Sequence, residues 1–151
     1  MNSSPILICY DGSDDSVGAI DAAAALFGKR RAIVLDVGPP LTASESLAAL
    51  GPMAPAAAFE QLNADDALTR AREGARRARR VGFDASARGI VEAPTWEGII
   101  EVADEVDADA IVVGSRGLTG LRERLSGSVS HDVAEHASRP VLIVPPASGR
   151  S

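Results

Sequence analysis

Five short runs of apolar residues, separated by longer segments with helical spacing, restrict this chain to very few folds. The runs are Ile6–Tyr10, Ala32–Val37, Ser86–Val91, Ala110–Val113 and Val141–Val144. Several of them are apolar throughout instead of alternating with polar residues, which is typical of strands buried on both faces. The pattern therefore predicts a sheet that is covered by helices.

The segments between these runs carry apolar residues three and four positions apart, as amphipathic helices do. The predicted helices are Asp14–Phe27, about Ala57–Val81, a segment from about Thr95 onward, and Ser128 to about Ser138. Thr95 is a candidate N-cap, and Gly82 and Pro140 are natural stops for the helices that precede them. We expect Trp96 to support the start of its helix as a half-buried side chain.

Strands and helices thus alternate along the chain, and parallel strands joined by right-handed helical crossovers are the default arrangement for that order. We predict an α/β fold, a five-stranded parallel doubly wound sheet with helices on both faces. A chain of 151 residues with 46% hydrophobic residues suits one domain over residues 1–151 that needs no disulfide or metal. The segment at about 42–58, rich in Ala, Ser and Pro, is expected to be a flexible loop.

Charge and composition exclude several classes of protein. The formal net charge of -6 argues against a general nucleic-acid binder, which carries an excess of basic residues. No apolar run approaches the roughly 20 residues of a membrane helix, and no signal peptide is visible. The single cysteine, Cys9, lies in an apolar run and is interpreted as a small buried side chain. We expect a cytoplasmic protein without membrane partners.

One segment departs from the acidic balance. Six arginines lie between positions 70 and 80, and Arg72, Arg76 and Arg80 are four residues apart on one helical face. Glu73 is spaced to pair with Arg77. The pattern fits a solvated helix face, and it also fits a patch that binds anions or docks a partner.

The strongest functional pattern follows the fourth apolar run. Gly114 and Gly117 come at the strand end, and Gly127 and Ser128 come just before a predicted helix. Glycine lets backbone N–H groups approach a phosphate closely, and a helix N-terminus offers unpaired N–H groups and a positive dipole end. The spacing therefore predicts a phosphate site to which the hydroxyls of Ser128 and Ser130 add hydrogen bonds.

This arrangement, Gly114-x2-Gly117-x9-Gly127-Ser128, resembles the ATP-binding signature of the universal stress protein family. The opening residues 6–13 and the closing residues 136–144 resemble that family too, so the resemblance covers almost the whole chain. It implies the strand order 3-2-1-4-5 and ATP binding, with Mg²⁺ as a candidate companion ion. It also implies a homodimer and a role in stress response or regulation.

The resemblance also implies which residues contact the nucleotide. Asp11 and Val37 would lie near the adenine and the ribose. The ribose and phosphates would be surrounded by Val113, Gly114, Gly117, Gly127, Ser128, Val129 and Ser130. Arg116 lies between two motif glycines, where it either reaches a phosphate or remains an exposed arginine. Asp11 either contacts the ligand or caps the turn that follows the first strand.

Other chemistries find little support in the sequence. The phosphate loop of P-loop enzymes is absent, and the only lysine, Lys29, is far from the glycine pattern. His131 and His136 are five residues apart, a poor spacing for a zinc site. We expect no catalytic residues and at most slow ATP hydrolysis. Two alternatives stay open: a nucleotide-free dimeric scaffold, and an adenylating enzyme that uses the turn after Asp11.

For the dimer, the resemblance to the family places the last run at the edge of the sheet. Val141–Val144 is fully apolar and has no charge or internal proline that would block strand pairing. A second copy of the chain is the simplest cover for such an edge. A regulatory protein partner is also expected, although its identity cannot be read from the sequence.

Overall fold

The computed structural model of the protein describes residues 3–39, 48, 50–115 and 129–146. Five strands form one sheet: β1 (Ile6–Cys9), β2 (Arg31–Gly38), β3 (Asp84–Val91), β4 (Ala110–Gly114) and β5 (Val141–Val144). All neighbouring pairs are parallel, and the order is β3-β2-β1-β4-β5. The parallel sheet and its 3-2-1-4-5 order are therefore confirmed.

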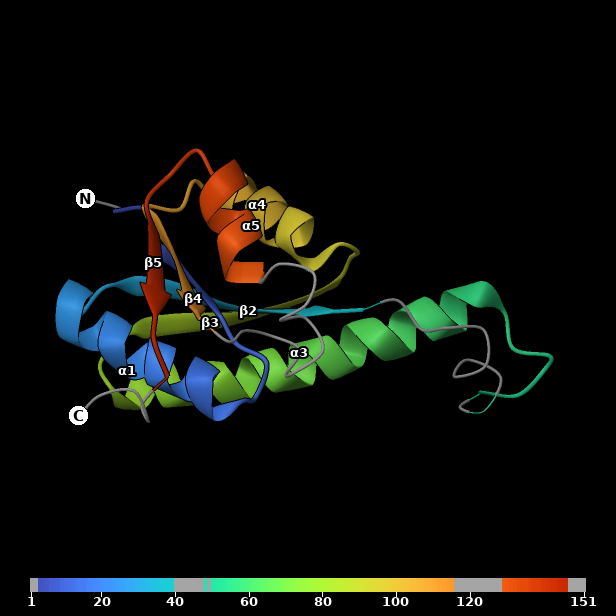
Figure 1. The fold of residues 1–151 in the computed structure, drawn as a ribbon. Coiled ribbons are helices and arrows are strands. Elements are labelled where there is room, and N and C mark those ends of the chain that lie inside the picture. Colours follow the sequence, from blue (N-terminus) through green and yellow to red (C-terminus); the bar gives the residue numbers. More distant parts are fainter. Residues whose placement is uncertain (1–2, 40–47, 49, 116–128, 147–151) are drawn as a thin grey trace.

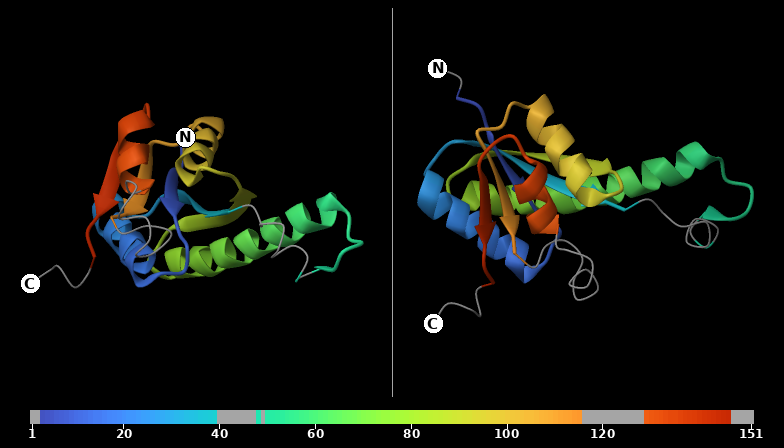
Figure 2. Two further views of the ribbon diagram at one scale, coloured as in Figure 1. Left: turned by 45° about the vertical axis from the view of Figure 1, so that its right-hand side comes forward. Right: turned by 45° about the horizontal axis from the view of Figure 1, so that its top comes forward.

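Helices cover both faces of this sheet (Figure 1). The helices of the described residues are α1 (Asp14–Phe27), α3 (Ala56–Arg80), α4 (Thr95–Glu105) and α5 (Val129–His136). Figure 2 shows α1 and α3 together on one face and α4 and α5 on the other, with the first turns of α3 extending past the sheet. The expected doubly wound arrangement is confirmed. None of the helices in the described part is long and apolar enough to cross a membrane.

Local sequence accounts for several of the helix ends. The Ser13 side chain caps α1 by accepting the N–H of Ser16 at 3.2 Å, and Gly28 ends the helix with φ of 67°. The prediction that Thr95 caps α4 is wrong. Pro94 occupies the N-cap in an extended conformation without a side-chain cap, and Thr95 is the first helical residue.

The loop predicted at about 42–58 is also shorter than expected at its end. Residues 56–58 already belong to α3, because three consecutive alanines favour a helix once Pro55 has set its N-cap. Positions 42–47 and 49 lie outside the described residues.

The sheet divides the interior into two apolar cores, and the alternating side chains of its central strand β1 enter both. Ile6, Ile8 and the following Tyr10 face α1 and α3, in what we call the α1–α3 core. Leu7 and Cys9 point the other way, into the α4–α5 core. This alternation is the period of two expected of a strand, and each core is closed by the helices on its side.

Helix α3 packs closely against the sheet. Gly74 and Gly89 make the approach possible, since a Cβ at Gly74 would come 2.6 Å from Cγ of Tyr10 and a Cβ at Gly89 would come 2.3 Å from the Leu68 nitrogen. The α3 residues that face the sheet are small and fully buried: Ala67, Ala71, Ala75 and Ala78. Small side chains on a helix let its backbone approach a neighbour closely.

Two ion pairs fix α3 to its surroundings. Nε of Arg70 donates to the carboxylate of Asp36 at 2.6 Å, and Asp36 on β2 is only 2% exposed. Burial raises the pKa of Asp36, and the hydrogen bond and charge of Arg70 oppose that increase. Arg77 pairs with Asp21 of α1 at 2.8 Å instead of with Glu73, so the predicted Glu73–Arg77 pair is wrong. Because α1 packs beside α3, the carboxylate of Asp21 is within reach of Arg77.

Helices α4 and α5 are joined by an aromatic contact. The ring of Trp96 stacks on the imidazole of His136, with ring centroids 4.3 Å apart and planes inclined by 19°. Trp96 is half-buried, as predicted, and His136 also bonds through Nδ1 to the carbonyl oxygen of Asp132 at 2.9 Å. The contact ties the start of α4 to the end of α5.

Candidate functional site

The strand order creates one place where neighbouring connections diverge. The chain proceeds from β1 to β2 and β3 in one direction, and β4 and β5 lie on the other side of β1. Helix α1, which follows β1, and helix α5, which precedes β5, cover opposite faces of the sheet (Figure 1). Ligands of doubly wound proteins bind at such a switch point, beyond the carboxyl ends of the strands.

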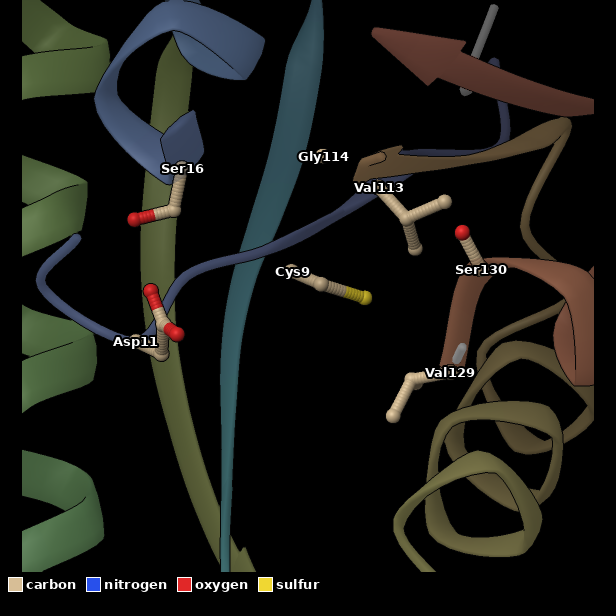
Figure 3. Close-up of a pocket in the computed structure, with 7 residues that line it drawn as sticks. All are labelled: Cys9, Asp11, Ser16, Val113, Gly114, Val129 and Ser130. Carbon is tan, nitrogen blue, oxygen red and sulfur yellow. The ribbon is translucent and has the colours of Figure 1, made fainter. Parts of the chain in front are cut away.

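A small pocket lies at this point. It is lined by Cys9, Asp11, Ser16, Val113, Gly114, Val129 and Ser130. Figure 3 shows Asp11 and Ser16 on one side of Cys9, with Val113, Val129 and Ser130 on the other side. The enclosed space is only about 10 Å³, the size of a single water site. The pocket is therefore too small to enclose a large ligand, which would have to rest on these residues from outside.

The first side of the pocket is a tight turn between β1 and α1. Oδ1 of Asp11 accepts the N–H of Ser13 at 2.9 Å, and Gly12 has φ of 86°, a value that favours glycine. The Ser16 hydroxyl donates to the Ser13 carbonyl oxygen at 2.8 Å. The turn holds the partly exposed Asp11 carboxylate beside the pocket, where its remaining lone pairs can accept hydrogen bonds.

The second side is the end of β4 and the start of α5. A Cβ at Gly114 would come 3.3 Å from the Asp15 carbonyl oxygen, so a side chain there would press on the first turn of α1. The Ser130 hydroxyl donates to the Ser115 carbonyl oxygen at 3.4 Å, which links α5 to the end of β4. Val129 and Ser130 open α5, so the amino end of that helix borders the pocket.

Cys9 lies between the two sides of the pocket, and burial disfavours ionisation of its thiol. Burial, followed by the carboxylates of Asp11 and Asp36, raises the pKa of Cys9 far above its ordinary value. The thiolate is the form that attacks electrophiles and binds metals, so burial makes Cys9 a poor nucleophile and a poor metal ligand. Among the described residues, no group of three or more His, Cys, Asp or Glu side chains could hold a metal ion.

The structure brings together half of the residues predicted for the site. Asp11, Val113, Gly114, Val129 and Ser130 all line the pocket. Val37 does not: it is 6% exposed and belongs to the α4–α5 core. The remaining predicted residues lie outside the described ones, namely Arg116, Gly117, Gly127 and Ser128.

Two lining residues were missed by the sequence analysis. Cys9 was interpreted as a core residue, and it is one, with 2% exposure, but its sulfur also reaches the pocket (Figure 3). Ser16 reads as an ordinary residue in the first turn of a helix. Its position next to Asp11 follows from the tightness of the turn, and the serines at positions 13 and 16 were the only signal for it.

Comparisons with known proteins agree with this arrangement. The sequence model of the Universal stress protein family matches residues 2–145. The chain is 33% identical over 144 residues to the universal stress protein YxiE of Bacillus subtilis, covering 92% of this chain and 97% of the relative. It is 31% identical over 149 residues to the universal stress protein Rv1636 of Mycobacterium tuberculosis, covering 92% and 94%.

Solved structures share the fold over nearly the full length. A universal stress protein in complex with cAMP has 30% identity and a TM-score of 0.68, covering 97% of this chain and 100% of that one. MJ0577 of Methanocaldococcus jannaschii has 25% identity and a TM-score of 0.71, covering 96% and 97%. The alternation of strands and helices described above is thus that of these proteins.

Proposed function

The chain belongs to the universal stress protein family, and from this premise we propose that it binds ATP at the carboxyl ends of β1 and β4 and acts as a regulatory nucleotide-binding module. One observation carries the proposal. The Asp11 turn, Gly114 and the amino end of α5 meet at the switch point of the sheet. The relative in complex with cAMP supports an adenine nucleotide as the class of ligand.

The chemistry of the lining residues fits such a ligand. A carboxylate suits ribose hydroxyls, which donate hydrogen bonds, and the first amides of α5 suit phosphate oxygens. In the proposal Asp11 binds the ribose, and Gly114, Val129 and Ser130 border the phosphates. Val37, which belongs to the α4–α5 core, would contribute to the apolar surface on which the base rests.

The motif residues outside the described part complete the proposed site. Gly117 and Gly127 would let the backbone approach the phosphates, Ser128 would add a hydroxyl, and Arg116 would add a charge. Mg²⁺ would arrive with the phosphates, since this ion usually keeps several waters and is bound mainly through them. The protein would release the nucleotide unchanged or hydrolyse it slowly, because no lysine or general base accompanies the motif.

Titration calorimetry with ATP, together with the nucleotide content of the purified protein, tests the proposal. Gly127→Val should abolish measurable binding, because any Cβ there would hold the phosphates away from the helix amides. Ser128→Ala should weaken binding by about 0.5–1.5 kcal/mol, the contribution of one hydrogen bond. Ser86→Ala, on an exposed position of β3, is the matched control for loss of a hydroxyl and should bind like the parent.

The alternatives give different results in the same experiment. A folded parent protein that carries no nucleotide and takes up no ATP would be a scaffold, in which the glycines serve only as turns. Release of pyrophosphate with a second substrate would indicate an adenylating enzyme. Turnover near the roughly 10 s⁻¹ typical of enzymes would contradict a binding protein.

We also propose that two copies pair through β5. This strand is at the edge of the sheet, and Ile143 on it is 40% exposed. An apolar edge strand presents unpaired backbone groups that a second copy would cover. Sedimentation of the parent should show a dimer at micromolar concentration, and Ile143→Lys should shift the population to monomer. A monomeric parent would overturn this part of the proposal.

A further inference from the structure

A groove on the α1–α3 side of the molecule has no role in the proposed nucleotide site. It is lined by Tyr10, Val17, Glu73, Arg76, Arg77 and Arg80 and encloses about 320 Å³. None of these residues lines the pocket at the switch point. Pockets for small molecules usually measure roughly 300–1,000 Å³, so the groove has the size of a ligand site.

Two of the three arginines that line the groove form no ion pair in the described structure. Arg76 and Arg80 are exposed and lie one turn apart on α3. Within residues 3–39, 50–115 and 129–146, neither of them forms an ion pair or a side-chain hydrogen bond. Like charges at this spacing destabilise a helix slightly. The arrangement therefore weakens the apo helix slightly, and an anion would remove that repulsion.

A third arginine, Arg77, also lines the groove. Arg77 is held by Asp21 of α1 at 2.8 Å, so its guanidinium spans the two helices. Its Nε is buried and has no hydrogen-bond partner in the described structure. The dipole of α3 favours cations in its last turn, which accounts for Arg77 and Arg80. It does not account for Arg76, which precedes that turn, or for the concave shape.

The other lining residues narrow the class of ligand. Tyr10, 4% exposed, contributes an aromatic surface, and Val17 of α1 contributes an apolar one. Glu73 adds a carboxylate, which would attract a hydrogen-bond donor and repel a second anionic group. The chain as a whole carries a net charge of -6, which repels a long polyanion. A compact ligand with one anionic group fits these surroundings better than a nucleic-acid strand.

We propose that the α1–α3 groove binds a small phosphorylated metabolite, with its phosphate between Arg76 and Arg80 and its uncharged part against Tyr10 and Glu73. A phosphate monoester carries a charge of about −1.5 to −2 and three terminal oxygens. It therefore matches two unpaired guanidinium groups, each of which offers several N–H donors in a planar fork. A carboxylate, with a single charge, would be satisfied by one of them.

Backbone and arginine Nε–H resonances of ¹⁵N-labelled protein, titrated with inorganic phosphate, provide the test. We expect saturable shifts at Tyr10, Arg76 and the Nε–H of Arg77. The double variant Arg76→Gln/Arg80→Gln should lower the affinity at least about tenfold, as expected for the loss of two charge-assisted contacts. Arg72→Gln removes the same kind of charge one turn away, outside the groove lining, and should change the affinity less than about twofold.

Several results would overturn the proposal. One is the absence of saturable shifts at the groove, and another is a loss in Arg72→Gln as large as in the double variant, which would indicate only a general positive field. Equal affinity for acetate at the same resonances would contradict the choice of phosphate. Phosphate bound at the switch point would instead move Gly114 and Ser130, so the two sites are distinguished by which resonances shift. The single variant Arg76→Gln replaces the double variant if the latter loses its folded spectrum.

Discussion

The two faces of the sheet are packed in different ways. On the α1–α3 face, glycine and alanine bring a helix so close that an added Cβ at Gly89 would lie 2.3 Å from the Leu68 nitrogen. On the α4–α5 face, the contacts are made by branched side chains such as Ile99, Val102 and Val133, all buried. One face thus relies on close approach of backbones and the other on the volume of side chains.

The difference explains where the molecule has room for ligands. Helix α3 packs closely on the sheet, so the groove on that face lies at the surface, among side chains of α1 and α3, and reaches the core only at Tyr10. The switch-point pocket lies instead between the start of α1 and the start of α5, beside Cys9, whose side chain belongs to the α4–α5 core. The larger space is thus at the surface of the closely packed face, and the smaller one lies at the ends of the strands.

The largest effect on stability should come from adding a methyl group where α3 packs on the sheet, on the α1–α3 face. Gly89→Ala should lower the free energy of unfolding by about 3 kcal/mol, because backbone atoms of Leu68 and Ala67 lie 2.3–2.6 Å from the new Cβ and cannot move aside cheaply. Urea unfolding, followed by circular dichroism, measures the change. Gly18→Ala in α1 is the control: nothing lies within 4 Å of its Cβ, so alanine should stabilise the helix by about 0.5–1 kcal/mol.

A smaller effect should follow from removing a methylene on the other face. Ile99→Val should lower the free energy of unfolding by about 1 kcal/mol, through lost burial and a small cavity. Ile100→Val on the same helix makes the same chemical change at a partly exposed position and should have less effect. If Ile99→Val proved more damaging than Gly89→Ala, the contrast between the two faces would not hold.

The smallest effect should appear only at high pH. Burial raises the pKa of Tyr10, the charges of Glu73 and Asp11 raise it further, and Arg77 lowers it. A raised folded-state pKa means that folding favours the neutral phenol. That contribution is complete below the unfolded pKa of about 10 and is lost as the pH rises through the folded pKa. The free energy of unfolding should therefore decline above about pH 10.

Tyr10 is the single tyrosine of the chain, so the absorbance of tyrosinate reports its titration directly. The apparent pKa should fall in Glu73→Gln and rise in Arg77→Gln, and Tyr10→Phe should lose the part of the alkaline decline that Tyr10 causes. If the native and the denatured chain titrate at the same pH, packing on the α1–α3 face does not shield the Tyr10 phenol from solvent.

Much of the fold could be predicted because it depends on local patterns. Short, mainly apolar runs marked the five strands, and their observed bounds differ from the predicted ones by at most two residues. The contacts between α3 and its neighbours could not be predicted in this way. Arg70 meets Asp36 from 34 positions away, and Arg77 meets Asp21 from 56 positions away. Such pairs depend on the packing of layers, which spacing along one helix does not reveal.

The candidate site shows the same division. Asp11 and Gly114 could be chosen because strand ends and glycines leave a mark in the sequence. Val37 was also chosen for the site, and its side chain is buried in the α4–α5 core and does not line the pocket, a placement that its position at a strand end does not reveal. The nucleotide roles of all these residues stay predictions until binding is measured.

The stacked pair of Trp96 and His136 gives the molecule an intrinsic optical reporter. Trp96 is the only tryptophan, so the fluorescence of the protein comes from one indole ring, packed against one imidazole at the end of α5. Indole emission depends on what touches the ring, and a shift of α5 relative to α4 changes that contact. The same short helix begins at the switch-point pocket. A change at the amino end of α5 that moves the helix can therefore be followed in real time, without any label, by the fluorescence of Trp96.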